Sequence, residues 1–256
     1  MDGNCSTCDE GINMKTAKKI IVGFALGLAA HGAMATPVTV GGVTWDPAYQ
    51  LDFSSASVQI QQFIGNDGAV SGFGFISTMN GANQASFCPG CELTFKFGNF
   101  TRWKEEGSQT YYKGGTLDIF VNTGVTFINP NDVTSMNAGN TGIGTLWLSL
   151  QGREIDGSSM MGSVNFRNPP NIAGLGQLDA VGGLARAWFD TNRQAGGADL
   201  AFSTSYTQPF PGQGMRHMGG TGNFFGATFQ HVPEPGSLAI FGLGLAGLVA
   251  SRRKRH

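Results

Sequence analysis

The chain has 256 residues, a formal net charge of −1 and 13% charged residues, where an average soluble protein has roughly 25%. Glycine is in excess, with 40 residues or about 16% of the chain, against an average of about 7%. Basic residues between positions 36 and 231 are scattered singly, which excludes the clustered Lys and Arg of a nucleic-acid-binding surface. Phenylalanine is spread along the same segment, which excludes a disordered chain.

Residues 14–35 have the three parts of a secretory signal peptide. Lys15, Lys18 and Lys19 form the basic start, and residues 20–30 form the apolar middle. Ala33 and Ala35 form the small-residue cleavage site. We expect signal peptidase to cut after Ala35, so that the mature chain begins at Thr36; an uncleaved membrane helix is the alternative. Residues 1–13, with Cys5 and Cys8, do not fit this scheme and are interpreted as an upstream extension without a function.

Residues 36–231 alternate short apolar runs with turns rich in Gly, Asn, Ser and Pro, which is typical of all-β domains. We predict a single antiparallel β-sandwich, jelly-roll-like, with about ten strands and no long helix. A first strand or hairpin is expected at residues 38–45, and further strands at residues 57–64, 70–77, 92–97, 116–121, 146–150, 160–166, 185–189, 199–206 and 223–230. Residues 172–184 are apolar but interrupted by glycine, and residues 208–222 are predicted to form a long loop.

The segment 92–97 shows the alternation most clearly. Its pattern predicts that Leu93, Phe95 and Phe97 point into the core. The same pattern predicts that Glu92, Thr94 and Lys96 point outwards.

Only two cysteines remain in the mature chain, Cys88 and Cys91, with Pro89-Gly90 between them. In an exported protein such a pair most often forms a local disulfide, and Pro-Gly supplies the turn that brings the two ends together. A thioredoxin-like redox site and a metal site are the alternatives. The first needs a βαβ context, and the second needs further ligands, of which the mature chain offers only His217 and His231.

Residues capable of catalysis are scarce, and we predict neither an enzyme, nor a cofactor, nor a metal. There is no G-x-S-x-G motif for a serine hydrolase. Glu92 is expected on an outward strand position and Glu105-Glu106 in a charged loop, which does not favour a pair of glycosidase carboxylates. Asp and Asn residues in turns could bind Ca²⁺, but no spacing matches a known calcium loop.

Aromatic residues offer a second kind of site. Trp103, Tyr111 and Tyr112 lie in a polar stretch and form the most plausible exposed cluster for contact with sugar rings.

The last residues have three parts in a fixed order. Pro233, Glu234 and Pro235 form a rigid opener, residues 238–250 are apolar, and Arg252, Arg253, Lys254 and Arg255 follow. An apolar span followed by basic residues predicts a membrane anchor whose basic end stays in the cytoplasm. The thirteen apolar residues reach roughly 20 Å as a helix, against about 30 Å for the hydrocarbon core, so the anchor is short.

This tail resembles the PEP-CTERM sorting signal of Gram-negative bacteria, over residues 232–256. The resemblance implies export, temporary anchoring in the inner membrane, processing near Pro233–Pro235 by an exosortase-type enzyme, and release to the cell surface or matrix. Residues 36–47 and 87–98 are also similar to flocculation-associated proteins of this class, which implies a role in cell aggregation with exopolysaccharide as a partner.

Three functions follow as hypotheses. The favoured one is an exported, non-enzymatic surface or matrix protein that contributes to biofilm or floc cohesion. A carbohydrate-binding module is the alternative, and a secreted hydrolase is favoured least.

Overall fold

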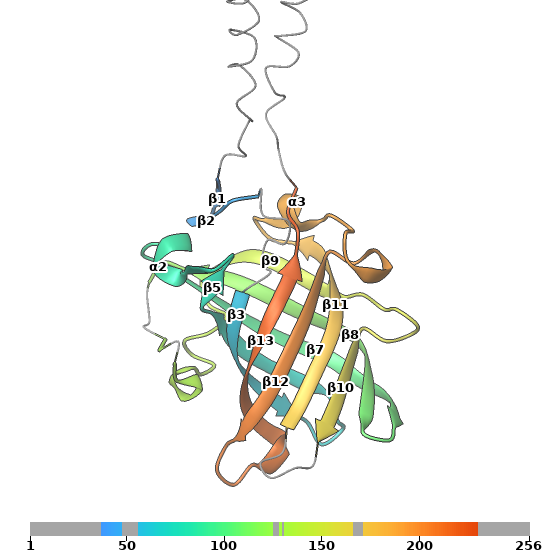
Figure 1. Cartoon of the computed structure of the whole chain (residues 1–256). Helices are drawn as coiled ribbons and strands as arrows, with labels where there is room; N and C mark the ends of the chain where they lie inside the picture. Colours follow the sequence, from blue (N-terminus) through green and yellow to red (C-terminus); the bar gives the residue numbers. More distant parts are fainter. Residues whose placement is uncertain (1–36, 48–55, 125–127, 130, 166–170, 230–256) are drawn as a thin grey trace, which may run out of the picture. The chain divides into compact units, whose positions relative to one another are not determined.

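Antiparallel strands form nearly all of the regular structure in the computed structural model, which describes residues 37–47, 56–124, 128–129, 131–165 and 171–229 (Figure 1). These residues belong to one unit, Ala35–His231. The strands are β1 (Val38–Val40), β2 (Val43–Trp45), β3 (Ala56–Ile64), β4 (Val70–Ile76), β5 (Thr78–Met79), β6 (Ala82–Asn83), β7 (Glu92–Glu106), β8 (Gln109–Asn122), β9 (Thr145–Gly152), β10 (Met160–Asn165), β11 (Asn171–Gly182), β12 (Leu200–Pro209) and β13 (His217–Gly226). The helices are short: α2 (Gln84–Phe87), α3 (Arg186–Phe189) and the 3-10 turns η1 (Val133–Ser135), η2 (Ala195–Gly197) and η3 (Gly214–Arg216).

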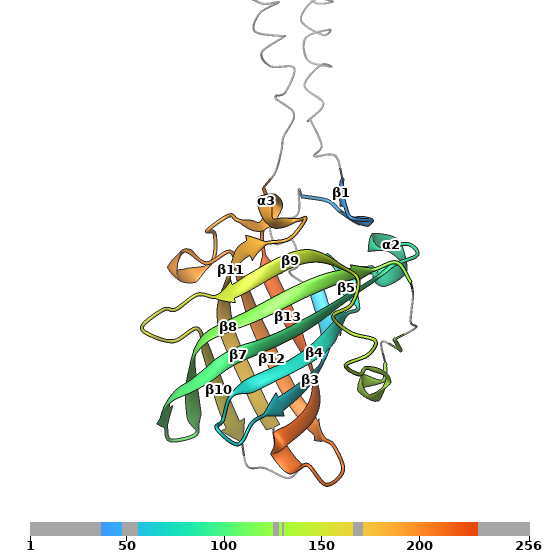
Figure 2. The ribbon, with the colours of Figure 1, turned by 180° about the vertical axis from the view of Figure 1, so that it is seen from behind.

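The main sheet closes on itself into a barrel. Its nine strands follow the order β10-β11-β12-β13-β3-β4-β7-β8-β9, with two further pairings, β10 with β8 and β11 with β9. β9 and β10 therefore share one position between β8 and β11, and the ring has eight positions. Figure 2 shows β4, β7, β8 and β9 crossing in front of the strands on the opposite wall, as expected for tilted strands in a closed barrel.

The predicted sandwich is therefore wrong, although the all-β class and the antiparallel pairing are confirmed. A sandwich has two separate sheets, whereas the pairings of β10 with β8 and of β11 with β9 join all nine strands into one closed sheet. β7 and β8 are its longest strands, with 15 and 14 residues. Each of them runs the full length of the barrel, with a register shift between Arg102 and Lys104 where the ribbon coils. Their outer halves, residues 98–106 and 109–115, lack clean apolar alternation and were not predicted as strands.

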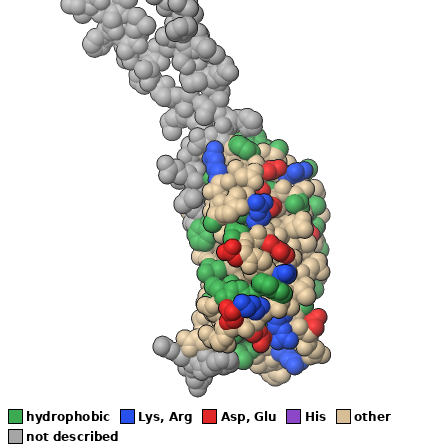
Figure 3. Space-filling view, turned by 90° about the vertical axis from the view of Figure 1, so that its right-hand side faces the viewer, with side chains coloured by type: hydrophobic (Ala, Val, Ile, Leu, Met, Phe, Trp, Pro, Cys, Tyr) green, Lys and Arg blue, Asp and Glu red, His purple; other side chains and the backbone are tan. Residues whose placement is uncertain are grey.

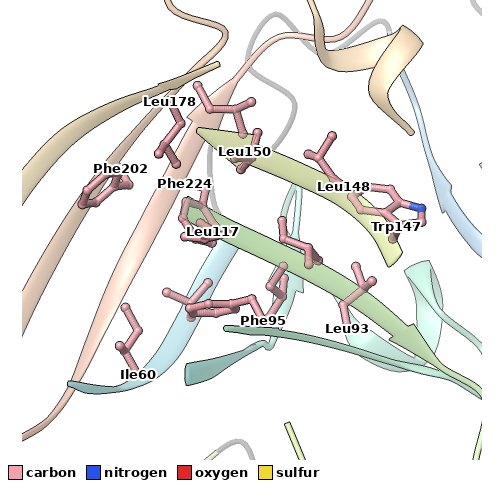
Figure 4. Close-up of a cluster of buried hydrophobic side chains, with 14 of the residues drawn as sticks. Ile60, Leu93, Phe95, Leu117, Trp147, Leu148, Leu150, Leu178, Phe202 and Phe224 are labelled. Carbon is pink, nitrogen blue, oxygen red and sulfur yellow. The ribbon is translucent and has the colours of Figure 1, made fainter. Parts of the chain in front are cut away.

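The interior of the barrel is filled by side chains from all around the ring. Ile60, Phe95, Leu117, Leu150, Leu178, Phe202 and Phe224 converge there (Figure 4). Phe95 and Phe224 meet edge to face, with ring centroids 5.5 Å apart, and Phe100 meets Phe202 in the same way. The interior holds two small spaces, of about 20 and 40 Å³, each with room for only one to a few water molecules. The barrel is thus a packed core.

Glycine in the strands makes room for these rings. Gly72 and Gly74 of β4 pair across the sheet with Phe97 and Phe95, and a methyl group on either glycine would overlap the opposite ring. Gly176 faces Phe202 in the same way. Much of the glycine excess therefore lies within strands, opposite large side chains, in addition to the turns that the composition predicts.

A second, smaller core lies on the outside of the barrel. Phe73 and Phe75 of β4 point outwards, where Ile128, Val133 and Met136 cover them. The same cover buries two residues at the start of β7, Glu92 and Thr94, that were predicted to face solvent. Glu92 is 3% exposed and accepts a hydrogen bond from the backbone N–H of Ile128 at 3.0 Å. Thr94 is fully buried and its hydroxyl accepts from the N–H of Gly142 at 2.9 Å.

Three further predictions along the chain need correction. Residues 185–189 were expected as a strand, but Arg186–Phe189 form α3. The stretch 172–184, left without a strand, is mostly β11, because its glycines allow the close approach of β10 and β12. The predicted loop 208–222 is much shorter, since β12 continues to Pro209 and β13 begins at His217.

Candidate functional site

Several predicted site residues lie outside the described residues. These are the signal-cleavage residues Ala33 and Ala35, the motif Pro233, Glu234 and Pro235, and the basic residues Arg252, Arg253, Lys254 and Arg255. The predicted apolar span 238–250 lies outside them too. Within the described residues, no helix is both long enough and apolar enough to span a bilayer.

The structure joins Cys88 and Cys91 by a disulfide, with the two Cα atoms 5.2 Å apart. α2 leads into it, capped by Asn83, whose side chain accepts from the N–H of Ser86. Both cysteines are buried beside Phe87, and β7 starts directly after Cys91. The disulfide thus fixes the turn before the longest strand. Among the described residues, no group of three His, Cys, Asp or Glu could hold a metal ion.

The carboxylates that were considered for catalysis do not come together. Glu105 and Glu106 are at the end of β7, exposed, and paired with Arg102 and Lys104. Glu92 is on the other half of β7 and holds the cover of the outer core. These three carboxylates therefore have structural or solvated positions.

Asp199 is a buried carboxylate that the sequence did not single out. It is 2% exposed, and its two oxygens accept hydrogen bonds of 2.6 to 2.7 Å from three backbone N–H groups, those of Ala180, Thr191 and Asn192. Asp199 thereby ties the segment after α3 to β11. Nothing in its local sequence distinguishes it from a turn residue.

The predicted aromatic cluster divides between the two faces of the sheet. Tyr112 points into the barrel and is 7% exposed, so it cannot contact a glycan, and burial raises the pKa of its hydroxyl. Trp103 is on the outside and 47% exposed, with the ammonium group of Lys113 4.2 Å from its ring centroid. Tyr111, one residue from Tyr112, also faces outwards, because neighbouring strand residues point to opposite sides.

Tyr111 borders a hollow of about 280 Å³ on the outer surface, which we call the outer hollow. It lies over β8, β10 and β11 and over the loop 153–159. Its lining includes Tyr111, Asp156, Ser158, Met161, Leu175 and Gln177. Sequence analysis did not find Met161, Leu175 or Gln177, because an outward apolar residue is recognisable only when the register of the strands is known.

A second hollow, of about 570 Å³, lies at the end of β3 and the start of β13. His217 borders it, stacked between the rings of Phe63 and Phe210 at centroid distances of 4.2 and 3.8 Å. The amide nitrogen of Gln61 donates to the carbonyls of Val133 and Met136, so its oxygen is left to accept from Nε2–H of His217 at 2.9 Å. Burial lowers the pKa of His217.

The first and last described segments meet at one end of the barrel, which we call the terminal end. Trp45 of β2 packs against Trp147 and Trp188 there, with ring centroids 5.8 and 6.1 Å apart. The indole N–H of Trp147 donates to the carbonyl of Val40 at 2.9 Å. The backbone N–H of Phe229 donates to the carbonyl of Trp188, also at 2.9 Å. The segment that precedes residues 230–256 is therefore fixed to the barrel.

The family model of the PEP-CTERM protein-sorting motif matches residues 231–254, which is the tail and not the barrel. A search of curated proteins found no match, and a search of solved structures found none either.

Proposed function

We propose that the barrel of this PEP-CTERM protein acts outside the cell as a non-enzymatic matrix component. The motif implies that exosortase sorts the chain towards the cell envelope or surface of a Gram-negative bacterium. The role of the barrel is to support cohesion of cells in biofilms or flocs. The single observation that carries this proposal is the sorting motif at residues 231–254.

Features of the barrel agree with this role. Its interior is a packed core, with two small spaces of about 20 and 40 Å³. The buried carboxylates Glu92 and Asp199 accept hydrogen bonds from backbone N–H groups and so maintain the fold. A local disulfide between Cys88 and Cys91 suits an oxidising compartment outside the cytoplasm.

The tail is tested by removing residues 233–256 from the chromosomal copy. We expect the truncated protein to lose surface display and to accumulate in the periplasm or the medium, because the processing enzyme no longer recognises it. A chain with Glu234→Ala tests the motif with a single side chain, and a chain with Phe229→Ala is the matched control outside it. Immunoblots of inner membrane, periplasm, surface and medium give the distribution. Unchanged surface display of the truncated protein would contradict sorting by this tail.

Cohesion is a separate measurement. A strain that lacks the protein should settle more slowly and form weaker flocs, and the full chain should restore settling, whereas the chain without residues 233–256 should not. Normal flocs in the deletion strain would refute the matrix role and leave the sorting result intact. Mass spectrometry of the surface form should find Thr36 at its start, as signal-peptide cleavage after Ala35 requires.

A further inference from the structure

We propose that the outer hollow, with Trp103 beside it, is a binding site for a polysaccharide chain. The proposal rests on the function proposed above in one respect: a polysaccharide bound at this site would be the ligand through which a matrix protein acts. The binding itself is independent of sorting and can be measured on the purified protein.

The register of the strands builds an apolar strip across the hollow. Tyr111 of β8 is the direct partner of Met161 of β10, and Met161 is the direct partner of Leu175 of β11. Neighbouring strands lie about 4.8 Å apart, so the three side chains form a continuous row across three strands. Leu175 is 52% exposed, the second largest exposed fraction among the described large apolar side chains. A sugar ring can lay its C–H face on such a row.

Trp103 extends the strip on the other side of the loop 153–159. Gly157 lies against its ring: an added Cβ there would be 3.2 Å from the Cη2 atom. The neighbours of Gly157 in the chain, Asp156 and Ser158, line the hollow. Trp103 and Tyr111 therefore offer two aromatic rings along one surface path, with the loop between them.

The polar groups of the hollow suit hydroxyl ligands. The side-chain oxygen of Gln177 lies buried in the lining and has no hydrogen-bond partner within the described part of the chain. A buried acceptor without a donor is unfavourable, so the Gln177 side chain gains a hydrogen bond if it turns its oxygen towards a sugar hydroxyl in the hollow. Asp156 at the rim adds a carboxylate that can accept from a second hydroxyl. The ammonium groups of Lys104 and Lys113 lie over the rings of Tyr111 and Trp103 and can donate to sugar oxygens.

The size and character of this surface favour a glycan over a protein partner. A stable protein interface buries about 800 Å² on each side and has a large apolar centre. Figure 3 shows the side of the molecule that lies to the right in Figure 1: groups of hydrophobic side chains lie among other atoms and among charged side chains of both signs. Narrow apolar strips bordered by hydrogen-bonding groups match sugar rings, which are apolar on their faces and polar at their edges.

The test is affinity electrophoresis of the exported protein, purified from the cell surface, in gels that contain dextran, alginate or the exopolysaccharide extracted from the producing cells. We expect at least one of them to retard the protein. Tyr111→Ala and Leu175→Ser should each weaken the association about tenfold, as expected for central contact residues. Tyr111→Phe keeps the ring and should bind like the parent. Retardation by alginate but not by dextran would identify the ligand as an acidic glycan. In that case Lys113→Gln should weaken the association of the protein with alginate.

Gln177→Met separates binding from folding. It removes the unpartnered acceptor at nearly constant volume, so the free protein should be at least as stable as the parent while its association weakens. Phe229→Ala, at the terminal end, is the exposed aromatic control and should bind normally. Absence of retardation in all three gels, or full retardation of Tyr111→Ala, would overturn the proposal. Surface display of the same variants is measured in parallel, so a failure of binding is distinguished from a failure of sorting.

Discussion

The indole N–H of Trp45 donates a hydrogen bond of 3.2 Å to the hydroxyl of Thr228, a residue 183 positions further along the chain. Both residues are almost fully buried, with exposed fractions of 4% and 1%. The contact joins the first hairpin of the described chain to the segment that follows the last strand. The terminal end of the barrel is thus built from both ends of the fold at once.

Trp45→Phe tests this contact. The smaller ring keeps most of the aromatic packing but loses the hydrogen bond to Thr228 and leaves a small gap, so we expect a loss of about 2 to 3 kcal/mol in unfolding free energy. Urea unfolding followed by circular dichroism measures it. Trp103→Phe, at an exposed position, is the matched control and should change the free energy by less than about 0.5 kcal/mol. Equal effects of the two variants would refute the structural role of Trp45.

Gly74→Ala tests the packing of glycine against rings. A methyl group at Gly74 would overlap the ring of Phe95 and the carbonyl oxygen of Gln59. We expect a loss of about 1 to 3 kcal/mol, because overpacked cores must shift side chains or backbone. Gly98→Ala is the control, since the nearest atom to its added methyl is Cβ of Ser71 at 3.6 Å. Thermal unfolding should leave the control near the parent, and a parent-like Gly74→Ala would contradict the packed interior.

Asp199→Asn tests the buried carboxylate. An amide keeps the shape of the side chain but places an NH₂ group against backbone N–H donors, and it removes the charge that strengthens the remaining bonds. The expected cost is about 2 to 3 kcal/mol in unfolding free energy. Glu154→Gln, on the surface, is the matched control. In the variant, the rate of hydrogen exchange should increase most at the backbone amides of Ala180, Thr191 and Asn192. Unchanged protection of these amides would count against the role of Asp199.

His217 makes stability depend on pH. Burial lowers its pKa below the ordinary 6.5, so between the two values the unfolded chain binds more protons than the folded chain. The contribution of His217 is therefore complete above about pH 6.5 and is lost as the pH falls through the folded pKa. We expect a lower urea midpoint at about pH 5 than at about pH 7.5.

The variant His217→Gln should make this dependence shallower, because glutamine can still donate to Gln61 but does not titrate. Hydrogen bonds from Thr134 lower the pKa of Asp132, the carboxylate of the covering loop, further below this pH interval. An identical slope for parent and variant would assign the dependence to other groups.

The alternation of apolar residues predicted the central strands well. Leu93 and Phe95 lie in the core, and the inner parts of β3, β4, β7, β8 and β12 coincide with predicted strands. The closure of the sheet into a barrel could not be predicted. It depends on the pairing of β10 with β8 and of β11 with β9, which joins the first strands in the sheet order to the last. β10 pairs with β8 only through four residues, Met160–Ser163, and nothing in that stretch encodes its partner.

The errors at single residues have the same origin. Local alternation places Glu92 and Thr94 outside the barrel correctly, but it does not show that residues 128–142 return to cover them. Tyr112 and Tyr111 were grouped because both are aromatic, and the two-residue period of a strand sends them to opposite faces. The outer hollow combines residues of three strands and one loop, so it exists only once the register is fixed.

The hydrogen bond between Trp45 and Thr228 holds both ends of the described chain at one end of the barrel, so the opposite end carries neither of them. Chain entry and chain exit are both bound at the terminal end, and Figures 1 and 2 place the turn between β7 and β8 at the other end of the barrel. Gly107 and Ser108 form the tip of that turn and are exposed. A short epitope inserted at this tip would leave both ends of the described chain undisturbed and would be accessible to an antibody.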